Sequence, residues 1–207
     1  MANLVSHALT NLSDVKETLG IDSGDSSKDN LITRKINQAT EMIEGYCGLS
    51  RGHHFTEATY TNEEYDGTGG HYLILHMRPV TSVDKFQYRD AALNEDDWTD
   101  VDNQSYFVDH DAGVIDLLFT PGSNFNRFRV TYTAGYDPIP ADLSEASVKL
   151  AAFLTDNEKQ GSGIKSQSEG RRKIEYFQPS EGSSILHQLS LDDVLDRYMM
   201  VPLIGDV

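Results

Sequence analysis

Four histidines in the first half of the chain are the residues best suited to bind a metal ion. They are His53, His54, His71 and His76. An imidazole nitrogen is a common zinc ligand. Adjacent residues of an extended strand point to opposite faces, however, so His53 and His54 cannot easily share one ion. We therefore expect histidines at the surface or at an interface, with no metal and no other cofactor bound.

Aspartates that could bind calcium are concentrated in one stretch. They are Asp96, Asp97, Asp100, Asp102, Asp109 and Asp111. An EF-hand loop needs ligands at fixed spacing, a central glycine and a final glutamate, and this stretch lacks that pattern. The sequence instead predicts a solvated acidic loop over residues 94–102.

Other motifs give no specific support to an enzyme. The stretch Gly67-Thr-Gly-Gly70 could bind phosphate only if a helix began directly behind it, and a P-loop also needs Lys-Ser/Thr. A strand pattern without lysine follows instead, which favours a hairpin turn. The chain has no Gly-x-Ser-x-Gly elbow and no Cys/His arrangement for nucleophilic catalysis. Carboxylate pairs are common in so acidic a chain, and they do not single out glycosidase chemistry.

The composition describes a folded and strongly acidic protein. The 207 residues include 17 Lys and Arg against 33 Asp and Glu, which gives a net charge of −16. Such a charge repels DNA phosphates, so sequence-specific DNA binding is not expected, although DNA can pass an acidic surface without binding. Cys47 is the only cysteine, which excludes an intramolecular disulfide. Residues 1–9 lack signal-peptide features and no apolar stretch could span a bilayer, so we expect a soluble protein.

The pattern of apolar residues predicts a mixed fold. Helical spacing predicts helices over residues 11–20, 29–47 and 141–160. Between them, residues 55–134 show the alternation and turns of short strands. We assign residues 1–160 to a core of class α+β: an α-helical bundle with an inserted small antiparallel β-sheet or barrel. A C-terminal helix and an extended tail follow this core.

The last quarter of the chain is predicted to be separate from the core. Residues 161–183 begin with a Gly/Ser/Gln-rich stretch, which indicates a flexible link. In residues 184–207, Ser184 can cap a helix, and the tail beyond it is apolar. Apolar residues at a chain end either pack on the domain's own core or are covered by a partner.

Several short stretches carry more information by their order than any one residue does. They are Leu12–Gly20, Ala39–Gly48, Tyr65–Gly67, Leu73–Leu75, Arg78–Val83, Val130–Tyr136 and Pro140–Leu143. In this order they resemble the head–tail connector proteins of tailed bacteriophages, also called adaptor or head completion proteins. The stretch Val130-Thr-Tyr-Thr-Ala-Gly-Tyr136 is the most specific, and a weaker likeness continues through residues 163–176.

The resemblance implies a structural virion protein and not an enzyme. Proteins of this family form a dodecameric ring under the portal, extend the DNA channel and join head to tail. The implied partners are further copies of the chain, the portal protein and a downstream neck or tail protein, with no membrane. DNA would pass through the channel without sequence-specific binding, and the neck would assemble in the host bacterial cytoplasm. Two alternatives stay open, a stopper or tail-terminator ring and a small metal-dependent hydrolase.

Two sets of residues are candidates for the implied contacts, and none is assigned a catalytic role. The portal-docking set lies in the C-terminal segment and consists of Ile185, Leu186, Leu189, Val194, Tyr198, Met199, Met200, Val201, Leu203 and Ile204. The inter-subunit set places basic Arg171, Arg172 and Lys173 opposite acidic Asp96, Asp97 and Asp100. Opposite charges suit a ring, in which each contact joins two different patches. We expect the C-terminal segment to be dispensable for folding.

Overall fold

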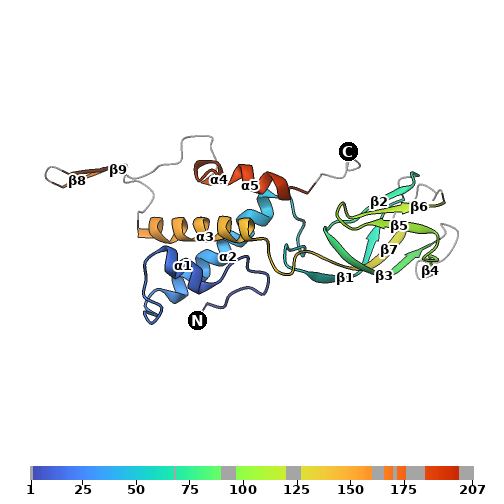
Figure 1. Ribbon diagram of the computed structural model, residues 1–207, viewed down its shortest axis with the longest axis horizontal. Coiled ribbons are helices and arrows are strands. Elements are labelled where there is room, and N and C mark those ends of the chain that lie inside the picture. The colour runs from blue at the N-terminus through green and yellow to red at the C-terminus, as the bar shows by residue number, and fades with distance from the viewer. Residues whose placement is uncertain are drawn as a thin grey trace. The chain divides into compact units, whose positions relative to one another are not determined.

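The chain divides into two compact units of different secondary structure. In the computed structural model the described residues are 2–67, 69–89, 97–119, 127–159, 166–169, 172–175 and 185–200. The helical unit comprises Met1–Cys47 and Ile139–Met199, and the β unit comprises Gly48–Pro138 with Met200–Val207. Figure 1 shows helices α1–α5 in the first unit and strands β1–β7 in the second.

Three helices, α1, α2 and α3, pack together in the helical unit through their buried residues. In front of α1 (Leu12–Thr18), the Asn11 side chain accepts a hydrogen bond of 3.0 Å from the backbone N–H of Asp14 and so caps the helix. α2 (Asp29–Tyr46) and α3 (Ala141–Asp156) pack against each other, and α1 packs against both. The buried stripes include Ile32, Ile36, Ala39 and Ile43 of α2 and Leu143, Ala146 and Leu150 of α3. None of the described helices has both the length and the apolar character needed to cross a membrane.

The C-terminal helices belong to the helical unit. The elements after α3 are η1 (Asn157–Lys159), the antiparallel strands β8 (Ser166–Glu169) and β9 (Arg172–Glu175), α4 (Ile185–Gln188), α5 (Asp192–Leu195) and η2 (Asp196–Tyr198). α5 packs against α3, and the Tyr198 hydroxyl donates to Asp142 of α3 at 2.5 Å. The buried leucines of this segment are Leu186, Leu191 and Leu195. The segment therefore contributes to the core of this unit, unlike the separate element expected from the sequence.

The larger sheet of the β unit has the strand order β1-β7-β3-β4, with antiparallel pairing throughout. Its strands are β1 (Ala58–Tyr65), β7 (Phe128–Ala134), β3 (Val80–Tyr88) and β4 (Thr99–Asp100). The buried residues of β7 alternate along the strand and are Phe128, Val130, Tyr132 and Ala134. This period of two places one face of β7 on the core of the β unit.

The smaller sheet has the strand order β2-β6-β5 and is also antiparallel. Its strands are β2 (Tyr72–Ile74), β6 (Val114–Leu117) and β5 (Tyr106–Asp109). One face buries Leu73, Ile115 and Leu117. The predicted fold class, α+β with antiparallel sheets, is confirmed, and the described strands form open sheets without closing a barrel.

Candidate functional site

A β-bulge in β1 turns Glu63 toward the inner face of the larger sheet. Tyr60 lies opposite Tyr132 of β7, and Glu63 lies opposite Val130. Between these two pairs, β1 therefore contains one residue more than β7. Within this bulge Asn62 has a φ of 56°, a left-handed conformation that asparagine tolerates. Tyr60 and Glu63 therefore share one face, although strict alternation would have separated them.

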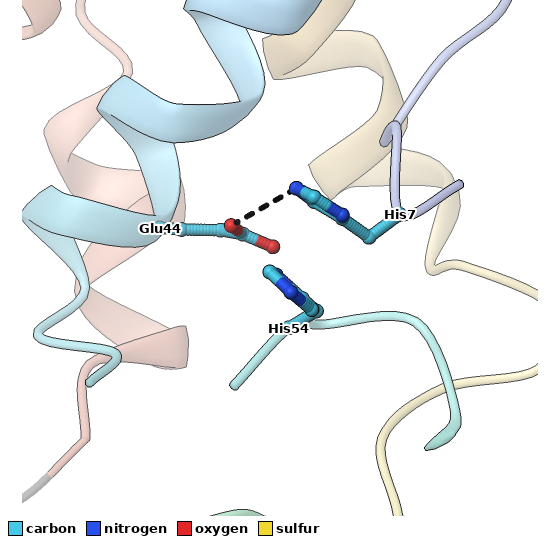
Figure 2. A group of neighbouring side chains, drawn as sticks. All are labelled: His7, Glu44 and His54. Atoms are coloured by element: carbon cyan, nitrogen blue, oxygen red, sulfur yellow. Dashed lines mark ion pairs between the residues drawn. The ribbon is translucent and has the colours of Figure 1, made fainter. Parts of the chain in front are cut away.

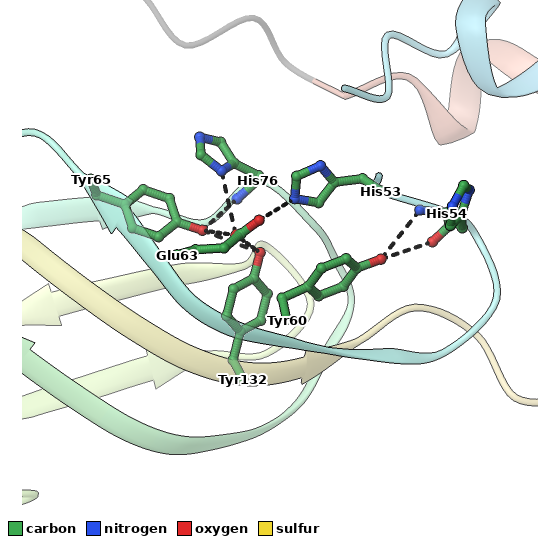
Figure 3. A network of polar contacts seen from close by, with 7 residues as sticks. All are labelled: His53, His54, Tyr60, Glu63, Tyr65, His76 and Tyr132. Carbon is green, nitrogen blue, oxygen red and sulfur yellow. Dashed lines mark hydrogen bonds and ion pairs between the residues drawn. The ribbon is translucent and has the colours of Figure 1, made fainter. Parts of the chain in front are cut away.

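Four side chains converge on the Glu63 carboxylate (Figure 3). His53 Nε2 lies 2.6 Å from Glu63 Oε1, and His76 Nδ1 lies 3.4 Å from Oε2. The hydroxyls of Tyr65 and Tyr132 each donate to Oε2 at 2.7 Å. We call these five residues the Glu63 cluster. They come from the segment before β1, from β1 itself, from the segment after β2 and from β7.

Aromatic stacking holds both imidazoles of the Glu63 cluster in place. The His53 ring stacks on Tyr60 with centroids 4.8 Å apart and planes 23° apart. The His76 ring stacks on Tyr65 at 4.5 Å and 27°. Tyr65 thus contacts His76 with its ring and Glu63 with its hydroxyl.

The cluster keeps Glu63 ionised and its tyrosines neutral. Burial alone would raise the pKa of Glu63, but hydrogen bonds from His53, His76, Tyr65 and Tyr132 outweigh it and hold that pKa well below its usual range. Burial raises the pKa of Tyr65 and of Tyr132, so both remain hydrogen-bond donors at neutral pH. The cluster is therefore a partly buried carboxylate surrounded by donors.

Replacing Glu63 with glutamine is expected to lower the free energy of unfolding of the β unit at pH 7 by about 1–3 kcal/mol, because an amide leaves donors around it unsatisfied. The folded-state pKa of Glu63 lies below its unfolded value of about 4.3, so the carboxylate stabilises the fold above that pH. This contribution is lost as the pH falls from there toward the folded-state pKa. The difference between wild type and Glu63→Gln should therefore shrink in acid, as measured by urea unfolding at pH 7 and at lower pH.

The adjacent Glu64 supplies the matched control. It is exposed on the opposite face of β1. We expect Glu64→Gln to change the unfolding free energy by less than about 0.5 kcal/mol at pH 7. Equal stability of the two variants at pH 7 would show that the Glu63 cluster contributes nothing to the fold.

The structure brings together only two of the four histidines considered from the sequence. His53 and His76 join the Glu63 cluster, whereas His71 Nδ1 lies 3.3 Å from the backbone oxygen of Leu117. The backbone of His54 hydrogen-bonds the Tyr60 hydroxyl through its N–H, at 3.2 Å. His53 and His54 point apart, as expected for adjacent residues, but the bulge in β1 supplies His53 with a carboxylate partner, Glu63.

A second pairing of histidine with glutamate occurs in the helical unit. His7 Nε2 lies 3.9 Å from Oε2 of the buried Glu44 of α2 and 3.7 Å from Oε1 of Glu41. Figure 2 shows the His7–Glu44 pair; His54, also drawn there, belongs to the β unit. These distances describe an ion pair that links the N-terminal segment to α2 when His7 is protonated.

The portal-docking candidates differ in accessibility. Leu186 is buried, with 4% of its surface exposed, whereas Met199 is exposed at 43%. Half-buried positions are Ile185, Leu189, Val194, Tyr198 and Met200. The remaining candidates, Val201, Leu203 and Ile204, lie outside the described residues. Among the described candidates, Met199 is the most exposed large apolar side chain. Docking to a portal stays a prediction.

The inter-subunit candidates are only partly described. Arg171 and Asp96 lie outside the described residues, and the backbone of Arg172 and Lys173 runs in β9. Asp97 and Asp100 are exposed. Asp100 already has partners in its own chain, because its Oδ1 accepts from Gln87 Nε2 at 2.6 Å and lies 3.8 Å from Lys85 Nζ. A contact of these charges between subunits stays a prediction.

An apolar face of the smaller sheet was not recognised in the sequence. The register places Tyr72 of β2, Asp116 of β6 and Phe107 of β5 in one row. The exposed apolar residues of this face are Tyr72, Ile74, Phe107 and Leu118, with 62%, 43%, 65% and 58% of their surfaces exposed. We call these four residues the outer apolar face. Asp116 lies between Tyr72 and Phe107 in this row. Several large exposed apolar side chains on one face are typical of an interaction surface.

The fold also assembles a basic cluster that the sequence did not indicate. Arg89, which follows β3, and Arg129 of β7 both stack on the Trp98 ring, with guanidinium carbons 4.9 and 4.4 Å from the ring centroid. Gln87 Oε1 accepts from Arg129 at 2.6 Å. Positive charge is therefore concentrated at this site as well as in the sequence of residues 171–173. Folding produces the Trp98 site by bringing together residues that lie far apart in the chain.

Comparisons with known proteins agree with this architecture. The chain of a structure described as the neck of an empty GTA particle, computed with C6 symmetry, is 19% identical with a TM-score of 0.55, and the match covers 99% of this chain and 98% of that one. A chain of the virion of a native gene transfer agent (GTA) particle is 17% identical with a TM-score of 0.56, covering 98% and 95%. A chain of the native GTA neck, computed with C12 symmetry, is 18% identical with a TM-score of 0.51, covering 99% and 98%. No curated protein matches the chain.

The fold is thus shared with subunits of gene transfer agent particles, over nearly the whole length of both chains. The model of the family described as "Head completion protein" matches residues 8–173, which is well over half of the sequence. The chain belongs to the head completion protein family, and the resemblance found in its sequence is confirmed.

Proposed function

We propose that this protein is a structural, non-enzymatic subunit of a head–tail neck, and that it forms the adaptor ring beneath the portal. The observation that carries the proposal is the family match over residues 8–173. Structures that share the fold are described as parts of a neck, with C6 and C12 symmetry. A twelvefold ring of this chain in the virion neck agrees with the description that gives C12 symmetry. In this proposal the ring joins a portal to a downstream neck or tail protein.

The surface chemistry supports an assembly role. The outer apolar face exposes four large side chains in the isolated chain, and burying such groups against a partner is favourable. A ring contact joins two different patches, so this face would meet a different surface of the next subunit or of a neck partner. The net charge of −16 suits a channel wall along which DNA slides without binding.

Deleting residues 199–207 is expected to abolish co-sedimentation with the portal protein while changing the melting temperature of the isolated subunit little. The deletion keeps the buried Leu195 and removes the exposed Met199 together with the rest of the apolar tail. Each apolar side chain buried on docking would contribute about 1.5–3 kcal/mol before the cost of ordering is subtracted. Sedimentation of mixtures with portal and a thermal melt of the free subunit measure the two effects.

Phe107→Ser serves as a comparison at a different surface, because Phe107 is 65% exposed on the outer apolar face. It should weaken subunit association, seen by native mass spectrometry, and leave portal binding by the subunit intact. A truncated subunit that still joins the portal would show that the tail is not the docking element. A truncated subunit that melts much earlier would assign the tail to the core. A full-length protein that binds a downstream neck protein but no portal would be a stopper and not an adaptor.

A further inference from the structure

The Glu63 cluster contains the ligand set of a transition-metal site. His53, Glu63 and His76 offer two imidazole nitrogens and one carboxylate oxygen, and these ligand atoms all lie within 4.8 Å of one another. Two histidines with one glutamate, completed by water, form a common zinc ligand set. We propose that these three residues bind one divalent ion of the zinc type, which ties the segments before β1 and after β2 to the bulge in β1.

The distances are close to those that a bound ion requires. Ligand atoms about 2.0–2.2 Å from a tetrahedral zinc ion stand roughly 3.3 Å apart. His76 Nδ1 lies 3.4 Å from Oε2, the other oxygen of the same carboxylate. The 2.6 Å between His53 Nε2 and Glu63 Oε1 is a hydrogen bond, so the ion would displace its proton and push the two atoms roughly 0.7 Å apart.

Neighbouring residues orient the three proposed ligand side chains. The hydroxyls of Tyr65 and Tyr132 both hold Glu63 Oε2, which leaves Oε1 as the oxygen that can turn to a metal. Hydrogen bonds to a ligating carboxylate typically strengthen metal binding by about 10–100-fold. The stacking of His53 on Tyr60 and of His76 on Tyr65 fixes the ring planes. The side chain of His76 is 33% exposed, which opens the cluster to solvent for a water ligand.

One atom weakens the proposed site. Bound through Nε2, His53 carries its proton on Nδ1, and that nitrogen is buried without a hydrogen-bond partner among the described residues. Histidine ligands of tight sites usually donate this proton to an acceptor. We therefore expect a moderate affinity for zinc. Without zinc, the cluster is held together by its own hydrogen bonds, and zinc binding replaces the one between His53 and Glu63. The inference does not depend on the proposed ring or on portal binding.

The test uses the full chain, freed of metal by dialysis against a chelator and then titrated with Zn²⁺ alone. We expect one zinc ion per chain by elemental analysis after gel filtration, a higher melting temperature with zinc, and the visible absorption of tetrahedral cobalt when Co²⁺ is used. Affinity should fall in acid, because a protonated histidine nitrogen cannot bind metal.

Two variants distinguish this site from other histidines. His76→Gln should lose at least tenfold in zinc affinity and lose the cobalt spectrum, whereas His71→Gln should match wild type. If His76→Gln does not fold, Tyr132→Phe replaces it, with an expected loss of about 10–100-fold from the missing hydrogen bond to Glu63. Absence of stoichiometric zinc in wild type, or equal affinity in the folded variant and wild type, would overturn the proposal and leave a metal-free cluster.

Discussion

Replacing Leu195 with alanine is expected to lower the free energy of unfolding of the helical unit by about 2–5 kcal/mol. Leu195 has no exposed surface, and it lies in α5, which packs against α3. Its backbone oxygen lies 3.6 Å from the Sγ of the buried Cys47 at the end of α2. Truncation to alanine leaves a cavity where α5 meets the rest of this unit. Urea unfolding followed by the helical circular dichroism signal measures the loss.

Met199→Ala is the matched control, four residues further along the same segment. Met199 is 43% exposed, and its truncation should change the unfolding free energy by less than about 0.5 kcal/mol. If Leu195→Ala were equally mild, the C-terminal helices would be loosely held and the original expectation of a dispensable segment would stand. The pair therefore distinguishes a residue that supports the fold from one that is free to contact a partner.

This distinction affects every docking experiment on the C-terminal segment. A deletion that begins at Ile185 would remove Leu186, Leu191 and Leu195 from the helical core as well as the tail. Loss of portal binding by such a deletion would then report unfolding. Variants confined to residues beyond Tyr198 avoid this ambiguity, because the Tyr198 hydroxyl still donates to Asp142 and holds η2 against α3.

The elements defined by local patterns could be predicted from the sequence. α2 was expected over residues 29–47 and spans Asp29–Tyr46, because Ile32, Ile36 and Ile43 recur at helical spacing. β7 (Phe128–Ala134) lies within residues 55–134, where alternation predicts short strands, and its residues do alternate between core and surface. Both signals depend only on neighbours in the chain, so tertiary contacts were not needed to find them.

The Glu63 cluster could not be predicted, because it depends on a single inserted residue. Strict alternation in β1 assigns Tyr60 and Glu63 to opposite faces, and the bulge at Asn62 reverses this for every residue that follows. A stretch of Thr, Tyr and Glu is compatible with a half-exposed strand both with and without the bulge, so the residue types do not reveal it. The His53 and His76 partners come from segments that only the folded sheets bring near β1.

The role of the C-terminal leucines was ambiguous for a different reason. An amphipathic helix shows the same apolar stripe whether it covers its own core or a partner, so Leu186 and Leu195 carried no signal that distinguishes the two. The outer apolar face escaped detection because β2 is apolar on both faces. Leu73 is buried while Tyr72 and Ile74 are exposed, and the sequence does not say which face meets the core.

Gly135→Ala is expected to destabilise the β unit by about 3 kcal/mol or more, from backbone strain and steric overlap together. Gly135 has a φ of 113°, which residues with a side chain rarely adopt. A Cβ atom there would lie 2.7 Å from the backbone oxygen of Thr56 and 2.8 Å from the backbone nitrogen of Glu57. Neither backbone atom can move freely, because the N–H of Glu57 donates to the oxygen of Tyr136 at 3.1 Å.

Gly52→Ala separates the two causes. Gly52 lies in the same unit with a φ of 87°, but a Cβ there would meet no described heavy atom within 4 Å. Its substitution should cost only the strain of a left-handed residue, about 1–2 kcal/mol. Thermal melts of both variants, followed by the near-ultraviolet signal of the β unit tyrosines, make the comparison. Equal losses would mean that the segment around Thr56 gives way easily. A larger loss at Gly135 would show that the close approach of the Thr56–Glu57 backbone leaves no room for a side chain there.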